Sequence, residues 1–456
     1  MKTKFYTNCR FFVLALLTAV VSCKKENHFL DAKPQLGIEI PTSLTDLQKL
    51  LHNEGVFNRN YPSLGELASD DYYVSTSRWS GQDPYFQNAY IWSKTLVDPN
   101  NIDHAWQDCY SQVYNANTVL DYLPKVPNTN QTLFNQIKGT ALFYRSIAFF
   151  NLLTIYASPY DPGTAASDLG IPLRLTSDLN AKSTRANQAQ CYHQIIADLQ
   201  EASTLLSSQV ADITSPSKVS AFGLLSRIYL SNGDFANCLS MAKSALAINS
   251  TLQDFNKLDP NAFPVYPNFS PEELFHAGME GNGFIGFQAQ VDSTILKSFS
   301  DQNDLRPSLF FYNDNGQMEF NSQFDINNNV TFSISNNEIY LNKAECEARS
   351  GDIQQAINDL NTLLIQRWKT GTFIPFLASN ADDALNKILK ERRKELLFTG
   401  LRWIDLRRLN KDSRFAITIY RNINGKTYSL PPNDPRYVFP IPQTEIQLTG
   451  EQQNLR

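Results

Sequence analysis

Two adjacent carboxylates, Asp70 and Asp71, stand at the start of a stretch of the chain that is rich in aromatic residues. A pair of carboxylates can serve as acid and base in glycoside cleavage, provided that the two groups flank the bond at a suitable separation. Side chains that are neighbours in sequence often point apart, and the sequence identifies no second carboxylate at that separation. We therefore interpret Asp70 and Asp71 as a cap or turn, or as hydrogen-bonding groups at a pocket, in preference to a catalytic pair.

The stretch that follows has the composition of a carbohydrate-binding surface. Between residues 72 and 92, seven of 21 residues are aromatic, whereas aromatic residues make up 12% of the whole chain. Most of the stretch is also dense in Ser, Gly, Asp and Pro, which indicates exposed loops. Flat aromatic faces suit the apolar C–H faces of sugar rings, and Asp, Asn and Arg side chains can bond to hydroxyl groups. We therefore expect a ligand to bind here.

Asp71 and five residues of this stretch are candidate ligand contacts: Tyr72, Tyr73, Arg78, Trp79 and Tyr85. Trp79 is the first choice of stacking platform because it lies beside Arg78 and Ser80 and outside any periodic pattern. Packing within a loop is its alternative role. Tyr90 and Trp92 alternate as in a short strand, which favours the core. The other tryptophans lie in helical patterns and are also expected in the core: Trp106, Trp368 and Trp403.

A second candidate segment, DLRPSLFFY, covers residues 304–312. Phe311 and Tyr312 are its candidate ligand contacts, whereas Asp304 and Arg306 are alternatively an internal salt bridge. The segment belongs to a region that is rich in Asn, Pro, Gly and aromatic residues and contains strand-like pieces such as TFSI. A long region with so little helical signal is usually functional or an insertion.

Signatures of other chemistries are incomplete. Gly425-Lys426-Thr427 resembles the end of a phosphate-binding loop, but Tyr420 occupies the place of the required first glycine. Asn313-Asp314-Asn315-Gly316 resembles a calcium loop, but its first ligand position would be Phe311. The chain has five His, none of them in an HExxH arrangement, and no GxSxG nucleophile motif. We therefore expect a binding protein without enzymatic activity, cofactor or metal.

Helices, which the spacing of apolar residues predicts, must form the scaffold that positions these loops. Apolar residues recur at helical spacing in residues 104–250 and 338–410. Two helix–turn–helix segments, at Gly233-Asp234 and Gly351-Asp352, share one pattern, with a small residue seven positions before the glycine and apolar residues nine and twelve after it. These positions are Ser226, Ala242 and Ala245 in the first segment and Ala344, Leu360 and Leu363 in the second. The pattern is typical of tetratricopeptide-type helix pairs.

The predicted fold class is therefore mainly α, with tetratricopeptide-like helix pairs, long irregular insertions and a few short strands. The insertions are residues 54–103 and 255–337, and the whole of residues 41–456 is expected to form one domain. Residues 391–409, ERRKELLFTGLRWIDLRRL, are expected to form an amphipathic helix whose charges alternate in sign. This alternation, together with a formal net charge of −5, argues against a nucleic-acid partner.

The N-terminus is predicted to carry a lipoprotein signal peptide over residues 1–22. A positively charged start precedes an apolar run, Phe11 to Val21, that is shorter than the roughly 20 residues needed to span a bilayer. The run ends in VVSC, which resembles a bacterial lipobox, so Cys23 is the predicted lipidation site. Residues 23–40 would then be a tether. An ordinary secretory signal is the alternative. The cysteines farther along the chain are expected to be buried free thiols: Cys109, Cys191, Cys238 and Cys346.

Taken together, these segments resemble the SusD/RagB family of outer-membrane nutrient-binding lipoproteins. The match runs in order along nearly the whole chain, from VVSC and GELASDDYY through IKGTALFYRSIAFFNLL and SPYDPGTAASDLGIPL to EIYLNKAECEARSGD, ERRKELLFTGLRWIDLRRL and YVFPIPQTEI. The resemblance implies a pocket built by loops from both irregular regions.

The resemblance also implies a place and a partner. The protein would be lipid-anchored at the outer membrane, facing the cell exterior, and would sit on a SusC-like TonB-dependent transporter. It would capture an oligosaccharide or polysaccharide, or alternatively a peptide, and hand it to the transporter. Two other readings stay open, namely a purely structural lid of the transporter and a glycan-cleaving enzyme.

Overall fold

The computed structural model describes residues 40–96, 104–262, 265–267, 269–281, 284, 289–321 and 330–456. The predicted signal peptide, the predicted lipidation site Cys23 and the tether up to residue 39 lie outside the described residues. Residues 43–456 form one unit.

The N-terminal helices of this unit pack around one largely buried helix. α9 (Gln131–Tyr156) is buried along most of its length, as expected for a helix that carries apolar side chains on every face. α3 (Leu44–Leu51), α8 (His104–Tyr122) and α10 (Gln188–Leu205) cover it. Its one buried cation, Arg145, donates to Asp198 on α10 at 2.8 Å and to Asn117 on α8 at 3.0 Å, which ties the three long helices together.

Two helix pairs confirm the predicted tetratricopeptide-like repeats. The first is α11 (Lys218–Asn232) with α12 (Phe235–Ile248), and the second is α15 (Asn336–Ser350) with α16 (Ile353–Leu364). Each turn contains a left-handed glycine, Gly233 at φ 81° and Gly351 at φ 89°, followed by an aspartate that caps the next helix. The six small and apolar positions of the repeat pattern are all buried where the helices meet.

The predicted helix over residues 391–409 is interrupted. α17 (Ala381–Glu395) covers only the first five of these residues, and α18 (Arg402–Leu409) begins after a turn in which Phe398 and Gly400 have φ of 57° and 79°. The Gly400 amide donates to the buried Glu66 at 3.1 Å, and a side chain at Gly400 would meet the Phe332 ring. The prediction of one continuous helix was wrong because these distant partners hold the turn. Arg392, Asp405 and Arg408 nevertheless form ion pairs within the protein, as expected for a scaffold.

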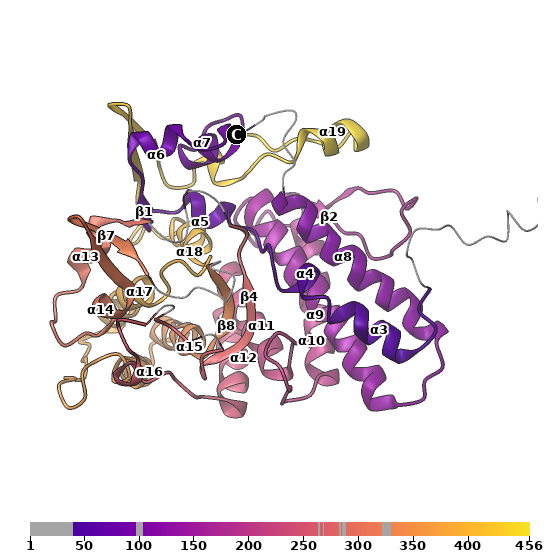
Figure 1. Ribbon diagram of the computed structural model, residues 1–456, viewed down its shortest axis with the longest axis horizontal. Coiled ribbons are helices and arrows are strands. Elements are labelled where there is room, and N and C mark those ends of the chain that lie inside the picture. Colours follow the sequence, from indigo (N-terminus) through magenta and orange to yellow (C-terminus); the bar gives the residue numbers. More distant parts are fainter. Residues whose placement is uncertain are drawn as a thin grey trace, which may run out of the picture. The chain divides into compact units, whose positions relative to one another are not determined.

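One small sheet joins the two irregular regions. Its strands are antiparallel and lie in the order β1 (Tyr72–Tyr73), β5 (Gln290–Val291), β7 (Gln317–Phe320) and β6 (Phe311–Asp314). A second sheet pairs β4 (Glu273–Gly278) with β8 (Thr331–Ser335), which contains the predicted TFSI strand. Figure 1 shows β4 and β8 between the α8–α10 helices and the α15–α17 helices.

Two motif-like segments are hairpin turns. Asn315-Gly316 connects β6 to β7, and Asn424-Gly425 connects β9 (Ile419–Ile423) to β10 (Lys426–Leu430). All four of these residues have positive φ, which is the conformation that favours Asn-Gly in tight hairpins. The residues that resemble a calcium loop and a phosphate-binding loop are therefore the Asn-Gly turns of two β-hairpins. β2 (Leu169–Pro172) and β3 (Arg185–Asn187) form a further antiparallel pair.

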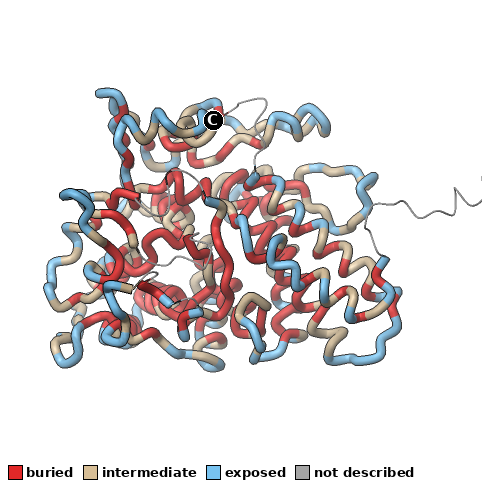
Figure 2. Tube along the Cα trace, viewed as in Figure 1, coloured by how far each residue is buried: buried red, intermediate tan, exposed pale blue. Residues whose placement is uncertain are grey.

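The remaining elements are short. The helices are α4 (Glu54–Phe57), α5 (Leu64–Ala68), α6 (Thr76–Ser80), α7 (Pro84–Tyr90), α13 (Ser293–Ser298), α14 (Arg306–Phe310) and α19 (Gln443–Thr449), and the 3-10 turns are η1 (Leu123–Lys125), η2 (Phe255–Lys257) and η3 (Pro435–Tyr437). Figure 2 shows buried residues concentrated where helices and sheets face each other, with the exposed residues on the outer turns. No helix among the described residues is both long and apolar enough to cross a membrane.

The aromatic stretch is more regular than the predicted loops. Ser75 and Asp83 cap α6 and α7, and Pro84 begins α7, so both short helices have ordinary start signals. Tyr90 ends α7 instead of lying in a strand, and Trp92 follows it at φ 53°. Both side chains are buried, as predicted. Trp106, Trp368 and Trp403 are buried as predicted, but Trp368 lies in an isolated β-bridge with Asp304 and not in a helix.

Candidate binding surface

The four-stranded sheet aligns candidate residues from both irregular regions. Tyr73 on β1 lies opposite Gln290 on β5, Gln290 lies opposite Glu319 on β7, and Glu319 lies opposite Tyr312 on β6. Residues directly opposite each other in antiparallel strands point to the same face of the sheet. These four residues are called the outer row below. Three strand-to-strand steps separate its two tyrosines, which corresponds to about 14 Å.

The opposite face of the same sheet is part of the hydrophobic core. The residues next to the outer row alternate to this side, and they are apolar or aromatic and buried: Tyr72, Val291, Phe311 and Phe320. Apolar burial therefore fixes the register, because a slip by one residue would turn the outer row inward.

The outer row combines exposed rings with buried polar groups. Tyr73 is 43% exposed and Tyr312 is half-buried, whereas Gln290 and Glu319 are buried between them. The Tyr312 hydroxyl donates to the Glu319 carboxylate. Burial, this hydrogen bond and the charge of Glu319 all raise the pKa of Tyr312. The phenol therefore stays protonated and is held in a fixed direction.

Arg78 brings a positive charge to this row. Its guanidinium donates to the Phe284 carbonyl at 3.5 Å, and it lies near the Glu319 carboxylate and the Tyr312 hydroxyl. Burial lowers the pKa of Arg78, and the three acidic groups around it, Tyr72, Glu319 and Tyr312, oppose that shift. Two partly exposed tyrosine rings and a half-buried guanidinium are therefore available on this surface, and the buried Gln290 and Glu319 hold the row between the rings.

Trp79 and Tyr85 lie beside the sheet, on α6 and α7. The Trp79 indole N–H donates to the Gln87 carbonyl at 3.0 Å, and its half-buried ring packs against the core. Tyr85 is half-buried and stands edge-to-face with Phe86, with 5.6 Å between ring centroids. Trp79 thus helps hold the two short helices together and still exposes part of its ring, so its role as a stacking platform stays a prediction.

Three of the predicted ligand contacts are buried and support the surface from below. Tyr72 donates its hydroxyl to the Leu67 carbonyl at 2.8 Å, and Phe311 packs edge-to-face on Phe299 at 5.8 Å. Asp71 is buried at the end of β1. Because none of the three offers an accessible side chain, we no longer place them among the ligand contacts.

The Asp70-Asp71 pair is anchored to the helical scaffold. Asp70 accepts two hydrogen bonds from Arg402, at 2.6 and 3.0 Å, and pairs with Arg393 at 2.8 Å. Burial by itself raises the pKa of Asp70, but Arg402 and Arg393 outweigh it and hold this pKa well below its ordinary value. Burial raises the pKa of Asp71 to about 6 against the same two arginines. The pair is thus a structural junction between β1 and α17–α18.

We expect Asp71→Asn to remove part of the pH dependence of stability. The folded pKa of about 6 exceeds the ordinary value of 3.8, so the folded protein keeps a proton that the unfolded chain has lost. The stability contributed by Asp71 is therefore full below pH 4 and is lost as the pH rises through 6, a change on the order of 1–3 kcal/mol. Urea unfolding at pH 4 and pH 7 measures it.

Asp70→Asn is the control for this experiment. The pKa of Asp70 is depressed, so its contribution is present at neutral pH and lost in acid. Asp70→Asn should therefore weaken the protein at pH 7, whereas Asp71→Asn should not. Equal pH dependence in the wild type and in Asp71→Asn would contradict the assignment.

Sequence reasoning missed Gln290 and Glu319. A signal for Glu319 was present, because a two-residue Asn315-Gly316 turn places Glu319 opposite Tyr312 by counting outward along the hairpin. Gln290 had no comparable local signal, since its neighbours β1 and β7 come from distant parts of the chain.

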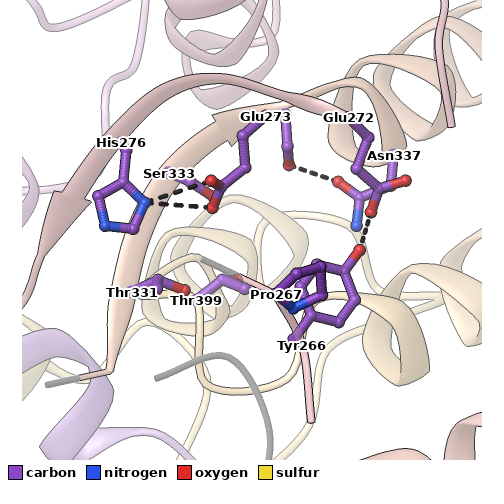
Figure 3. A pocket seen from close by; sticks show the side chains of 10 residues that line it. Tyr266, Pro267, Glu272, Glu273, His276, Thr331, Ser333, Asn337 and Thr399 are labelled. Carbon is purple, nitrogen blue, oxygen red and sulfur yellow. Dashed lines mark hydrogen bonds and ion pairs between the residues drawn. The ribbon is translucent and has the colours of Figure 1, made fainter. Parts of the chain in front are cut away.

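A second polar site, shown in Figure 3, is too small for a sugar. It lies under β4 and β8 and has a volume of about 20 Å³, which suits one water molecule. The His276 Nδ1 atom lies 3.2 Å from the Glu273 carboxylate, and the Tyr266 hydroxyl donates to Glu272. No group of three or more His, Cys, Asp or Glu among the described residues is arranged to hold a metal ion.

The fold and the surface define a helical-repeat binding protein that carries its candidate ligand groups on an inserted sheet. Residues 28–230 match a SusD-like family model described as "Starch-binding associating with outer membrane", and residues 321–455 match the SusD family model. The chain belongs to the SusD/RagB family, as the ordered motifs predicted.

Individual relatives are distant. SusD-like protein P38 of Formosa agariphila is 22% identical over 445 residues, covering 80% of this chain and 81% of that protein. SusD-like protein P2 of the same organism is 26% identical over 168 residues, which cover 37% of this chain and only 31% of that protein.

Solved structures share the fold over nearly the whole chain. A SusD superfamily protein from Bacteroides thetaiotaomicron has a TM-score of 0.75 and 24% identity, and the alignment covers 91% of this chain and all of that one. A structure described as a laminarin-binding SusD-like protein has a TM-score of 0.66 and 18% identity, with 91% and 99% covered. These likenesses confirm the mainly helical fold.

Proposed function

We propose that the protein binds a glycan across the outer row and delivers it to a SusC-like TonB-dependent transporter. The observation that carries the proposal is the register that aligns Tyr73 and Tyr312 on one face, about 14 Å apart. This separation exceeds one sugar ring, so the surface suits an oligosaccharide or polysaccharide. The rings would stack on C–H faces, and the half-buried Arg78 beside the row would bond to hydroxyls.

The surface is proposed to bind its ligand without cleaving it. Acid–base cleavage needs two carboxylates that flank the bond. The described carboxylates around the outer row are already occupied, because Glu319 accepts from Tyr312 and Asp70 is paired with two arginines. Asp71 is buried away from the surface.

The family is associated with the outer membrane, and two finer steps are part of the proposal. A lipid on Cys23 would anchor the chain, with the binding surface facing the exterior. Holding a glycan next to the transporter raises its effective concentration at the channel without any new contact. Co-purification with the transporter from outer membranes tests this step, and a chain that is recovered without it would contradict delivery.

The binding step is tested with Tyr73→Ala and Tyr312→Ala. Each change should lower glycan affinity by about 5- to 30-fold, corresponding to about 1–2 kcal/mol for a lost stacking face. Tyr122→Ala, at the far end of α8, is the control and should leave affinity unchanged. A glycan array selects the ligand, and titration calorimetry measures the affinity. Binding that survives both changes would overturn the assignment, and a protein that binds peptides but no glycan would have the alternative ligand class.

A further inference from the structure

A second, larger cavity lies apart from the outer row, between α8, the loop after β2 and α19. Its volume is about 430 Å³, which falls within the range of small-molecule pockets. Tyr110 and Tyr114 face it from successive turns of α8, Arg174 and Leu179 from the loop, and Glu445 from α19. Figure 1 shows α8, β2 and α19 on the side of the unit away from β1 and β7.

The floor of this cavity is rigid. The Tyr110 ring lies 4.8 Å from the Trp106 ring, and Trp106 in turn stands edge-to-face on Tyr156 at 5.0 Å. The Tyr110 hydroxyl donates to the Pro172 carbonyl at 2.9 Å, which joins the helix to the end of β2.

The loop wall is fixed to α8 by two buried or half-buried side chains. Asn117 donates to the carbonyls of Arg174 and Thr176 at 2.8 and 3.3 Å. Asp121 accepts hydrogen bonds from Thr176 and Ser177 at 2.8–3.0 Å. A cavity whose walls are both held in this way is formed before any ligand binds. Binding therefore costs the protein little conformational entropy.

The groups that remain available set the chemistry of a ligand. Tyr114 is 40% exposed and presents a ring face, and Gln107 and Ser111 add neutral polar groups from the same side of α8. Glu445 is half-buried and burial raises its pKa, with Arg174 near enough to oppose that shift. No ion pair involving Glu445 occurs among the residues that the structure describes, so its carboxylate can accept from a ligand.

The same groups disfavour an anionic ligand. The two Nη atoms of Arg174 donate to the carbonyls of Ala181 and Asp178, at 3.2 and 2.7 Å, so the guanidinium is not positioned to clamp a carboxylate or phosphate. Glu445 would repel such a group. A neutral ring with hydroxyl donors and an apolar face fits all of these constraints.

We propose that this cavity is a second binding site, for one or two neutral sugar rings that stack on Tyr114 and donate hydroxyl hydrogen bonds to Glu445. The site does not depend on the outer row, since no residue is shared. The protein would then hold two sugars at once or bind a branched glycan at two places.

The test removes the outer row first. Maltose, cellobiose, laminaribiose and mannobiose are added separately at millimolar concentration to the full-length Tyr73→Ala/Tyr312→Ala protein, and saturation-transfer NMR detects binding. At least one disaccharide should give a signal, and adding Tyr114→Ala should reduce that signal by roughly fivefold or more. Glu445→Gln alone, which leaves the ring in place, should reduce it as well. Tyr122→Ala is the matched control.

Three results would overturn the proposal. They are the absence of signal from all four disaccharides, a signal that Tyr114→Ala and Glu445→Gln leave unchanged, and binding of glucosamine in place of the neutral sugars, which would identify a cation site. None of these results depends on whether the outer row binds a glycan. The outer row is tested separately, by the affinity of the wild-type protein for longer glycans.

Discussion

Replacing Glu395 with glutamine is expected to destabilise the protein by about 3–5 kcal/mol. Glu395 is buried and shared by two buried arginines, with Arg367 at 2.7 Å and Arg306 at 3.3 Å. Burial by itself raises the pKa of Glu395, but the two arginines hold it below its ordinary value. Glutamine keeps the shape of the side chain but removes its negative charge. The two buried arginines then lose part of the attraction that offsets the free-energy cost of burying them.

This cluster is expected to matter because it joins distant segments. Arg306 also pairs with Asp304 at 2.7 Å and with Glu391 at 2.6 Å, and Arg367 pairs with Glu272 at 2.9 Å. The carboxylates come from the second irregular region and from α17, so the network holds the inserted segments on the helical scaffold. Removing one member of a buried network leaves its partners without a counter-charge. The free-energy cost of these unpaired buried charges exceeds the net stabilisation that the ion pair provides.

Urea unfolding at pH 7 measures the effect. Glu201→Gln is the control, because the Glu201–Lys138 pair is exposed and such pairs contribute about 0–1 kcal/mol. A loss below about 1 kcal/mol in Glu395→Gln would show that water or rearrangement compensates the arginines.

The same cluster shows what a sequence can predict about charges. The Asp304–Arg306 salt bridge was visible as a pair of neighbours in sequence, and it is present. The partners across the fold were not visible, because a helix pattern gives the face of a residue and not the element packed against that face. Arg392 on α17, for example, pairs with Asp405 on α18, across the turn that the sequence did not predict.

Helix pairs were predictable because their signals are local. The turns at Gly233 and Gly351 and the small residues seven positions earlier repeat within one segment of chain, and burial confirms both. The break between α17 and α18 was not predictable in the same way. Its turn depends on Glu66, which lies more than 300 residues earlier.

The binding surface was predictable as a region but not residue by residue. Tyr72 and Tyr73 are neighbours of the same type, and the alternation of a strand sends one to the core and the other to the surface. Composition cannot decide which is which. The decision comes from β5, whose Val291 opposes Tyr72 and whose Gln290 opposes Tyr73. Long-range strand pairing therefore decides which of the candidate ligand contacts reach the surface.

Arg421 is expected to hold β1, and with it the candidate binding surface, in place from the core side of the sheet. Its replacement by methionine should therefore affect both stability and glycan binding. Arg421 is a buried residue of β9, and its guanidinium lies 4.2 Å from the Tyr90 ring centroid and 5.3 Å from those of Tyr72 and Trp92. It donates to the Tyr72 carbonyl at 2.6 Å and to the Ser69 carbonyl. One side chain thus joins the C-terminal hairpin to the strand that carries Tyr73.

Methionine fills similar space but removes the cation and both hydrogen bonds. Two carbonyls and three ring faces then lose their partner, so we expect a loss of about 2–4 kcal/mol. Arg421→Lys keeps a charge over the rings and can replace one hydrogen bond, so its loss should be smaller. Tyr420→Ala, an exposed neighbour on the same strand, is the control and should change stability little.

The readout that separates support of the surface from general stability is glycan affinity measured well below the unfolding transition. If Arg421 positions β1, then Arg421→Met should weaken binding by roughly the same factor as Tyr73→Ala, and adding the second change to the first should cost little more. Additive losses would mean that the two residues act independently. Full affinity in a folded Arg421→Met protein would mean that Arg421 is not needed to position Tyr73. The backbone pairing of β1 with β5 would then be sufficient.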